Sequence, residues 1–265
     1  MRAFRVAYDG DPYRGFQRQP DVRTVEGTLF RALRRHGVFE GEKPENYAAA
    51  GRTDAGVSAL AQTVAFECPE WLTPAAFNGE LPAEIRVWAS ADAEGFHARY
   101  DALSRAYAYH LHAPAADDEL LRAALDRFVG AHDFHNLTPD GGDTTRTIRE
   151  ADLEREGEFV VVTVRADGFL RQLVRRLVSL VAAVGRGERD PAFAERALSD
   201  ERLTGPEGIP PAPPEPLVLV DVTYDLDFEV DERGAESARE VFGEKRVERE
   251  AGARVAGFIE RGVDG

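Results

Sequence analysis

The sequence predicts an α+β fold of two similar halves, each with a mostly antiparallel sheet and flanking helices. Strand-like alternation and helical periodicity recur in the same order in both parts of the 265-residue chain. A hydrophobic fraction of 43% with 9% aromatic residues is typical of a globular protein. We expect residues 1–98 to form the N-terminal half, 99–225 the C-terminal half, and 226–265 a charged, helical extension.

The N-terminal half begins with alternating residues over 2–8, which predict a strand. A loop rich in glycine and proline follows, and Thr24 then provides a suitable cap for a helix over roughly 25–36. Further strand-like segments lie near 46–50, 61–67 and 84–88.

The C-terminal half repeats this order. Clean alternation over 105–112 predicts a strand, and an acidic start predicts a helix over about 117–130. The apolar run 158–166 predicts a continuously buried strand. A short helix near 191–199 and a last strand over 217–224 complete this half.

The chain is acidic, with a formal net charge of −15 at pH 7, and lysine occurs only at Lys43 and Lys245. At molar ionic strength the Debye length is about 3 Å, so the self-repulsion of such a surface is largely screened. We interpret the composition as an adaptation to concentrated salt. By itself it argues against a nucleic-acid partner, because phosphate binding usually requires a basic surface.

Residues 168–187 are the exception, since they include Arg171, Arg175, Arg176 and Arg186 and no acid. The apolar residues of this segment recur at helical spacing, and Arg171 and Arg175 would share one face of the helix. The arginines either are solvated at the rim of a core helix or form a local basic surface for a ligand.

Two histidine pairs, His110 with His112 and His132 with His135, could ligate a metal in principle. The alternation around the first pair is more typical of a half-buried strand. We therefore expect no metal site, and no cofactor either, since no nucleotide-binding or nucleophile motif occurs. The lone Cys68 and an N-terminus that begins as a strand favour a cytoplasmic protein without a membrane segment.

Residues 51–56, with the sequence GRTDAG, place Asp54 on a turn between two glycines, two positions after Arg52. Glycines allow tight turns and close approaches, so this carboxylate could project into a cleft with a guanidinium nearby. Taken alone, the segment fits a solvated turn between two strands better.

Two other segments also allow alternatives. The proline-rich stretch 209–216 favours a stiff lead-in to the last strand over a polyproline ligand for a partner domain. The extension beyond about residue 226 favours a solvated or loosely docked helix, with an RNA or partner contact as the second interpretation.

Six segments match, in order, the sequence blocks of one protein family: YDGDPYRGFQRQP, AGRTDAGVSA, FHARYDALSRAYAYHL, VGAHDFHNL, GFLRQLVRRLV and APPEPLVLVDVTY. They lie between about residues 8 and 224, so they cover nearly the whole chain apart from the extension. The chain therefore resembles the tRNA pseudouridine synthases of the tRNA pseudouridine synthase A type.

The resemblance implies the pseudouridine synthase fold, with the active-site cleft between the halves, and a homodimer without a cofactor. It implies isomerisation of uridine to pseudouridine in tRNA, at positions 38–40 of the anticodon stem-loop. Asp54 would be the catalytic residue, as nucleophile or as base, and Arg175 would pair with it. Arg52 would hold the target nucleotide out of the stack and Tyr107 would pack on its base, where stacking returns roughly 1–3 kcal/mol.

Further RNA contacts are expected from Arg14, Gln17, Arg171 and Arg176. The chain departs from the family's common pattern near the site, where Ser58 replaces histidine, Arg176 replaces asparagine and Ser179 replaces glycine. We expect Ser58 and Arg176 to flank the site, where they would alter how the RNA is gripped.

Two other classes remain as alternatives. One is a non-catalytic RNA-binding module of the same fold, and the intact set of Asp, Arg and Tyr argues against it. The other is a lyase or isomerase that uses an Asp–Arg pair on a small molecule, and the basic segment 168–187 argues against it.

Overall fold

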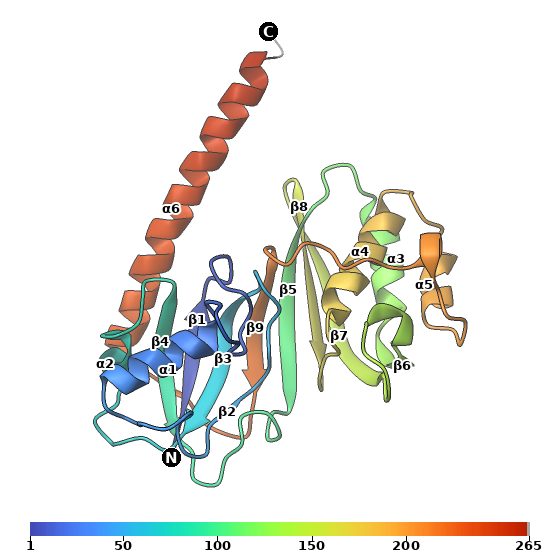
Figure 1. Ribbon diagram of the computed structural model, residues 1–265. Helices are drawn as coiled ribbons and strands as arrows, with labels where there is room; N and C mark the ends of the chain where they lie inside the picture. Colours follow the sequence, from blue (N-terminus) through green and yellow to red (C-terminus); the bar gives the residue numbers. More distant parts are fainter. Residues whose placement is uncertain (264–265) are drawn as a thin grey trace.

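The computed structural model describes residues 1–263 and contains one continuous sheet that runs through both halves of the molecule (Figure 1). The strand order is β10-β4-β1-β3-β9-β5-β8-β7-β6, and β2 pairs with β3. The strands are β1 Arg2–Tyr8, β2 Ala48–Ala49, β3 Ser58–Phe66, β4 Ile85–Asp92, β5 Ser104–His112, β6 Gly130–Asp133, β7 Thr145–Glu156, β8 Phe159–Ala166, β9 Leu217–Thr223 and β10 Glu229–Val230. The α-helices are α1 Val25–Arg35, α2 Pro74–Asn78, α3 Asp118–Asp126, α4 Leu173–Gly185, α5 Ala192–Ala197 and α6 Glu232–Val263.

The two halves of the sheet are joined by a parallel pairing between β3 and β9, in which Ser58 pairs with Val218 and Ala59 with Leu219. Every other strand pairing among residues 1–263 is antiparallel. The α+β fold with a mostly antiparallel sheet is therefore confirmed. Because β3 begins directly after the 51–56 turn, this junction sets that turn against the C-terminal half.

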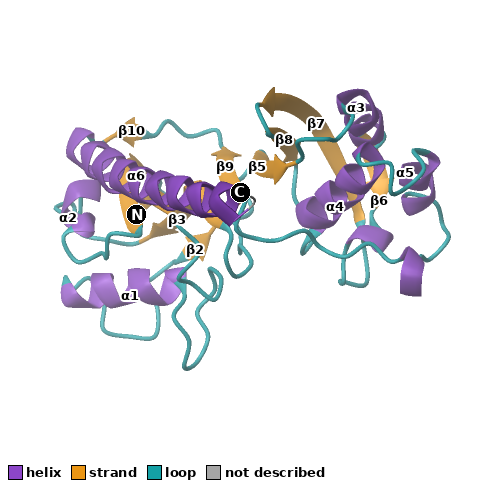
Figure 2. Ribbon diagram, turned by 90° about the horizontal axis from the view of Figure 1, so that it is seen from above, coloured by secondary structure: helices purple, strands orange, loops and turns teal. Residues whose placement is uncertain are grey.

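Two large hydrophobic cores lie under the helices, one in each part of the sheet. Figures 1 and 2 show α1 over the β1–β3 part and α4 over the β5–β8 part, on the same face. Tyr107 packs against both cores, at the seam between them. The face that the helices cover is thus the face on which a cleft between the halves can form.

Most of the expected elements occur near their expected bounds. The helix predicted over 25–36 is α1, and the Thr24 side chain accepts a hydrogen bond from the backbone N–H of Gly27 as its cap. β7 was not expected, because its 12 residues are mostly polar and contain no apolar run that would indicate a strand. The prediction of a continuously buried strand over 158–166 was wrong: Val160, Val162 and Val164 are buried but alternate with half-exposed residues, since helices cover one face of the sheet here.

The helix predicted from 168 begins only at Leu173, so the expectation that Arg171 shares a helix face with Arg175 was wrong. Gln172 has a φ of 62°, a left-handed conformation that does not continue a helix toward the N-terminus. Arg171 therefore lies in the turn before α4, while Arg175 lies in the first turn of the helix proper.

The extension forms α6, whose first turns pack on the edge strand β4. The Gly234 backbone lies against the Val87 carbonyl, and Arg86 donates a hydrogen bond of 3.0 Å to Ser237. The C-terminal part of α6 continues past the rest of the molecule, as Figure 1 shows, and nearly all of its described residues after Arg249 are exposed. No helix in the described part of the chain has the length and apolar character needed to cross a membrane.

Candidate active site

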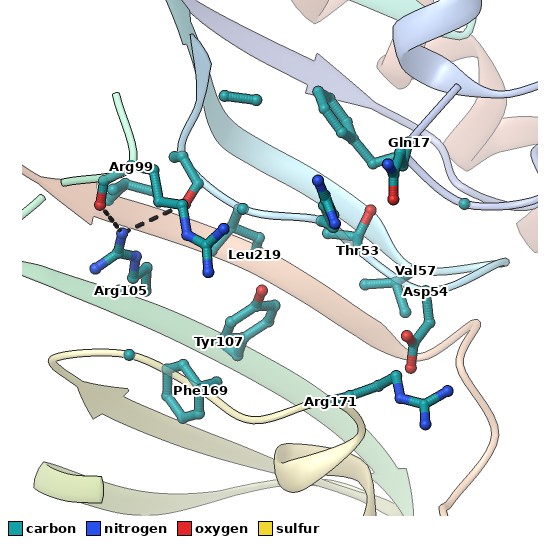
Figure 3. A pocket seen from close by; sticks show the side chains of 18 of the residues that line it. Gln17, Thr53, Asp54, Val57, Arg99, Arg105, Tyr107, Phe169, Arg171 and Leu219 are labelled. Carbon is teal, nitrogen blue, oxygen red and sulfur yellow. Dashed lines mark hydrogen bonds between the residues drawn. The ribbon is translucent and has the colours of Figure 1, made fainter. Parts of the chain in front are cut away.

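A cavity of about 1140 Å³ lies between the two halves. Its walls come from the β1–α1 loop, the 51–57 turn, the segment before β5, the strand β5 itself and the start of α4. Figure 3 shows the side chains of Asp54, Tyr107 and Arg105 among those that line it. Residues from both halves of the chain thus meet where the two parts of the sheet join.

Asp54 lies on an irregular segment, which we call the Asp54 loop (residues 51–57), and the neighbouring β1–α1 loop holds this segment in place. The backbone N–H of Phe16 donates to the Thr53 carbonyl at 3.0 Å, and the hydroxyls of Tyr8 and Thr53 hydrogen-bond at 2.8 Å. Gly10 lies so close that a Cβ atom there would be 2.2 Å from the Val57 carbonyl oxygen. A glycine is therefore required at position 10 for the two loops to meet.

Arg175 reaches across the seam from α4. Its guanidinium donates a 2.9 Å hydrogen bond to Oδ2 of Asp54, and the two side chains are 12% and 28% exposed. A second guanidinium nitrogen donates to the Ala212 carbonyl at 2.7 Å. Both bonds fix the direction of the guanidinium, so the carboxylate of Asp54 is held in one orientation.

The proline-rich stretch 209–216 takes part in this arrangement. Besides accepting from the Arg175 side chain, Ala212 donates its backbone N–H to the Arg175 carbonyl at 3.1 Å. Pro214 lies against Gly56 of the Asp54 loop, where an added Cβ would be 3.0 Å from the proline ring. The stretch is the lead-in to β9 that the sequence favours, and it also supports Asp54 and Arg175.

Tyr107 lies on β5 with its ring edge-to-face against Phe169, at 5.1 Å between ring centroids. In Figure 3 the tyrosine ring lies between Phe169 and the residues of the Asp54 loop. Burial, and next the negative charge of Asp54, raises the pKa of Tyr107 to about 12. The phenol therefore stays neutral at physiological pH, and it offers a flat ring and an O–H donor rather than a base.

Three of the predicted substrate-contacting residues, Arg14, Gln17 and Arg52, line the cavity and are exposed. Within residues 1–263 their side chains form no hydrogen bond or ion pair. They are free to bind a ligand in the cavity.

The other two predicted contacts are already engaged. Arg171 lines the cavity and pairs with Asp140 at 3.0 Å. Arg176 donates to the Ile209 carbonyl at 2.5 Å and to the Gln172 side chain, and it is not among the described residues that line the cavity. Ser58 is also outside that lining, because its hydroxyl accepts the backbone N–H of Gly10 at 3.0 Å. Both residues still flank the site as expected, because Ser58 follows Val57 and Arg176 follows Arg175, two residues that line the cavity.

Sequence reasoning missed Arg105, which ties the walls of the cavity together. Its guanidinium donates to four backbone carbonyls, those of Arg99 (2.6 Å), Asp167 (2.6 Å), Ala50 (3.3 Å) and Ala102 (3.3 Å). Two of its hydrogen bonds are drawn in Figure 3. Burial lowers the pKa of Arg105. Its position two residues before Tyr107, on the same side of a predicted strand, was the signal in the sequence.

The histidine pairs do not come together with acidic residues as a metal site. Among residues 1–263, no three side chains of the His, Cys, Asp or Glu types lie close enough to hold an ion. His112 lies 3.9 Å from Glu158, and His135 lies 3.4 Å from Asp133. The His112 side chain is exposed and the His135 side chain is largely buried, and each contacts one carboxylate among residues 1–263.

A family model described as tRNA pseudouridine synthase matches residues 124–225. The tRNA pseudouridine synthase A of Natronomonas pharaonis is 60% identical to this chain over 98% of each, and that of Haloarcula marismortui is 57% identical over 99% of this chain and 100% of its own. Such halophilic relatives agree with the salt adaptation expected from the acidic composition.

Among solved structures, a chain of the archaeal box H/ACA Nop10–Cbf5 complex aligns with 69% of this chain and 44% of its own, at 14% identity and a TM-score of 0.40, which is too distant to support an inference. The curated relatives align along nearly their whole length. On this basis, the chain belongs to the tRNA pseudouridine synthase family.

Proposed function

We propose that this protein isomerises uridine to pseudouridine at positions 38–40 of the tRNA anticodon stem-loop, in the cytoplasm and as a homodimer. One observation carries the proposal. A carboxylate from the N-terminal half, Asp54, is paired at 2.9 Å with Arg175 from the C-terminal half, beside the ring of Tyr107 in one cavity. Family membership supports the same reaction.

In this reaction the bond from ribose C1′ to N1 of uracil breaks, and a bond from C1′ to C5 forms. C5 loses its proton and N1 gains one, so the isomerisation is redox-neutral. Asp54 is the group that acts on the nucleotide, either as nucleophile or as base. Arg175 keeps the carboxylate of Asp54 directed into the cavity, and Tyr107 supports the uracil ring by stacking.

The charge around the cavity supports a phosphate-bearing substrate. Of the described residues, seven arginines and four carboxylates line it, in a chain whose net charge is −15. The arginines are Arg14, Arg52, Arg99, Arg105, Arg146, Arg171 and Arg175. A cleft in an acidic protein that is lined by more arginines than carboxylates favours a polyanion there.

The size of the cavity is compatible with a nucleotide of an RNA chain. Small-molecule sites usually enclose roughly 300–1,000 Å³, whereas this cavity measures about 1140 Å³. A flipped nucleotide together with its neighbours can fill it, since enzymes that act on a base must first extrude it from the stack. Family membership makes a lyase or isomerase for free nucleotides the weaker candidate.

The test is to map pseudouridine in tRNA incubated in molar salt with wild-type protein, Asp54→Ala or Asp54→Asn. We expect both variants to form no product while their tRNA affinity stays within about threefold, because Asp54 acts on the base rather than on the phosphates. Asp140→Asn is the matched control, since Asp140 also lines the cavity but pairs with Arg171. It should retain product formation.

Retained activity in Asp54→Ala would remove Asp54 from the mechanism. A wild-type protein that binds tRNA but leaves its uridines unchanged would favour the non-catalytic RNA-binding module. The mapped positions decide the 38–40 assignment, and sedimentation of the full chain, alone and with tRNA, decides the homodimer.

A further inference from the structure

The segment between the two halves, residues 96–102, presents an aromatic ring at the cavity wall. Tyr100 lines the cavity and is 76% exposed. On one side its ring stacks on the imidazole of His97, with 4.2 Å between centroids and 27° between planes. The other face of the tyrosine has no aromatic partner among residues 1–263.

This segment is held rigidly. His97 Nδ1 accepts the backbone N–H groups of Arg99 and Tyr100 at 3.2 and 3.3 Å, and Asp101 accepts the backbone N–H of His97 at 2.7 Å. Arg105 binds the carbonyls of Arg99 and Ala102 from below. The exposed ring of Tyr100 is therefore presented in a fixed position rather than on a loose loop.

Single exposed aromatic residues are common and need no explanation. Three further features set Tyr100 apart: its loop is pinned, its ring is backed by a second ring, and it lies in the wall of a basic cavity. Arg99 adds a cation 6.0 Å from the centre of the Tyr100 ring, and its side chain forms no hydrogen bond or ion pair within residues 1–263. An aromatic face beside a free arginine is the combination that binds an unpaired base and its phosphate.

The other aromatic rings in the cavity wall are engaged in packing. Phe16 is buried, and Phe169 lies against Tyr107. Arg105 lies on β5 two residues before Tyr107 and on the same face, so it connects the loop of Tyr100 to the strand of Tyr107. The two tyrosines thus belong to one rigid wall.

We propose that Tyr100 is a second stacking platform, which receives an unpaired base of the RNA next to the uridine held at Tyr107, while Arg99 binds the adjoining phosphate. This rests on the proposed function, because it takes RNA as the occupant of the cavity. The platform grips the strand beside the reacting nucleotide, and it contributes to RNA binding rather than to the chemical step.

The first test measures RNA affinity for Tyr100→Ala and Tyr100→Phe with an anticodon stem-loop RNA. Loss of one stacked base should weaken binding of Tyr100→Ala roughly 5- to 150-fold, the equivalent of about 1–3 kcal/mol. Tyr100→Phe keeps the ring and should bind within about twofold of wild type. Single-turnover pseudouridine formation at saturating enzyme should change less than about threefold in either variant.

Phe159→Ala is the matched control. Phe159 is 45% exposed and also lies against a histidine, His112, at 5.1 Å, but this pair is not among the described residues that line the cavity. Its loss should leave RNA affinity unchanged. Equal weakening by Phe159→Ala and Tyr100→Ala, or no weakening by Tyr100→Ala, overturns the platform.

The second test replaces one loop nucleotide of the RNA at a time by an abasic residue. We expect one position at which the abasic RNA binds wild type as weakly as intact RNA binds Tyr100→Ala, and at which the variant loses nothing further. If the two losses add at every position, no base stacks on Tyr100 and the proposal fails.

The same series distinguishes this proposal from the proposed function. Suppose that Tyr100→Ala weakens RNA binding and one abasic position reproduces that loss, but wild type forms no pseudouridine. The platform then stands and the proposed activity fails. If wild type does not bind the RNA at all, both fail. If Asp54→Ala loses product while Tyr100→Ala binds as wild type, the activity stands and only the platform is overturned.

Discussion

The two halves of the molecule supply the site by different means. The N-terminal half provides Asp54 on an irregular loop between β2 and β3, whereas the C-terminal half provides Tyr107 on a central strand and Arg175 on a buried helix. The loop is held by backbone contacts with a second loop, and the strand and helix are held by the hydrophobic core. The carboxylate thus depends on close backbone fit, and the residues that orient it depend on side-chain packing.

This difference predicts different sensitivities. α4 presents Leu173, Leu177 and Val181 to a continuous core, so the direction of Arg175 is set by periodic packing. The Asp54 loop has no such periodicity, and a single added methyl group at its contact with the β1–α1 loop has no space. Three variants probe the comparison, in order of expected effect.

The largest effect should come from cutting the link between the halves with Arg175→Leu. Asp54 would then lose the guanidinium that orients it, and removing one such preorganised donor costs roughly 10²–10³-fold in rate. Single-turnover pseudouridine formation measures the loss. Arg176 is the next residue on α4, and within residues 1–263 its side chain hydrogen-bonds only to Gln172 and the Ile209 carbonyl, so Arg176→Leu should cost less than about tenfold. Equal losses in both variants would show that the helix, rather than the Asp54 contact, matters.

The second variant, Gly10→Ala, disturbs the loop contact in the N-terminal half. The new Cβ would meet the Val57 carbonyl at 2.2 Å, so the Asp54 loop must shift. A displacement on the order of 1 Å costs about 10²-fold in rate, and overpacking costs about 1–3 kcal/mol of stability. Gly41→Ala is the control for rate and melting temperature, since no atom of the described residues other than its chain neighbours lies within 4 Å of the added Cβ. Full activity in Gly10→Ala would mean that the loop tolerates movement.

The smallest effect should come from the contact between α6 and the β1–α1 loop. Asp9 is 5% exposed and pairs with Lys245 at 2.5 Å and with Arg249 at 2.8 Å. The double variant Lys245→Ala/Arg249→Ala leaves the buried carboxylate without either cation. Because both cations are themselves partly exposed, the loss in the free energy of unfolding at pH 7 should be only about 1–2 kcal/mol. Arg246→Ala, which pairs with the exposed Glu250, should lose less than about 0.5 kcal/mol.

The pH dependence sharpens this last test. Burial alone would raise the pKa of Asp9, but the hydrogen bonds from Lys245 and from the backbone N–H of Asp11, and then the charge of Arg249, outweigh it and lower the pKa below the ordinary value of 3.8. A carboxyl group with a lowered pKa stabilises the fold fully above the ordinary value, and this contribution is lost as pH falls through the lowered one. The stability difference between wild type and the double variant should therefore be largest near neutral pH and shrink below pH 3.8. A difference that is constant across this range would contradict the pairing.

Much of the fold followed from local patterns. α1 and its Thr24 cap, β1, β5 and β9 were predicted because their periodicity and capping signals lie within a few adjacent residues. β7 was missed because its alternation is carried by charged and small residues, not by an apolar face. The helix α4 was expected to begin before Leu173, but the left-handed backbone of Gln172 prevents this. Nothing in the local sequence indicates that conformation.

The sequence by itself determined the family, the acidic and lysine-poor character, and the choice of Asp54, because these depend on residue identity and order. Only the tertiary structure decided what meets Asp54. Its bond to Arg175 joins residues 121 positions apart, and the parallel β3–β9 pairing and the 209–216 stretch bring them together. The same is true of Arg105, Arg176 and Tyr100, whose roles depend on which backbone or cavity each side chain faces. No local sequence pattern specifies these contacts, because they depend on how the two halves pack against each other.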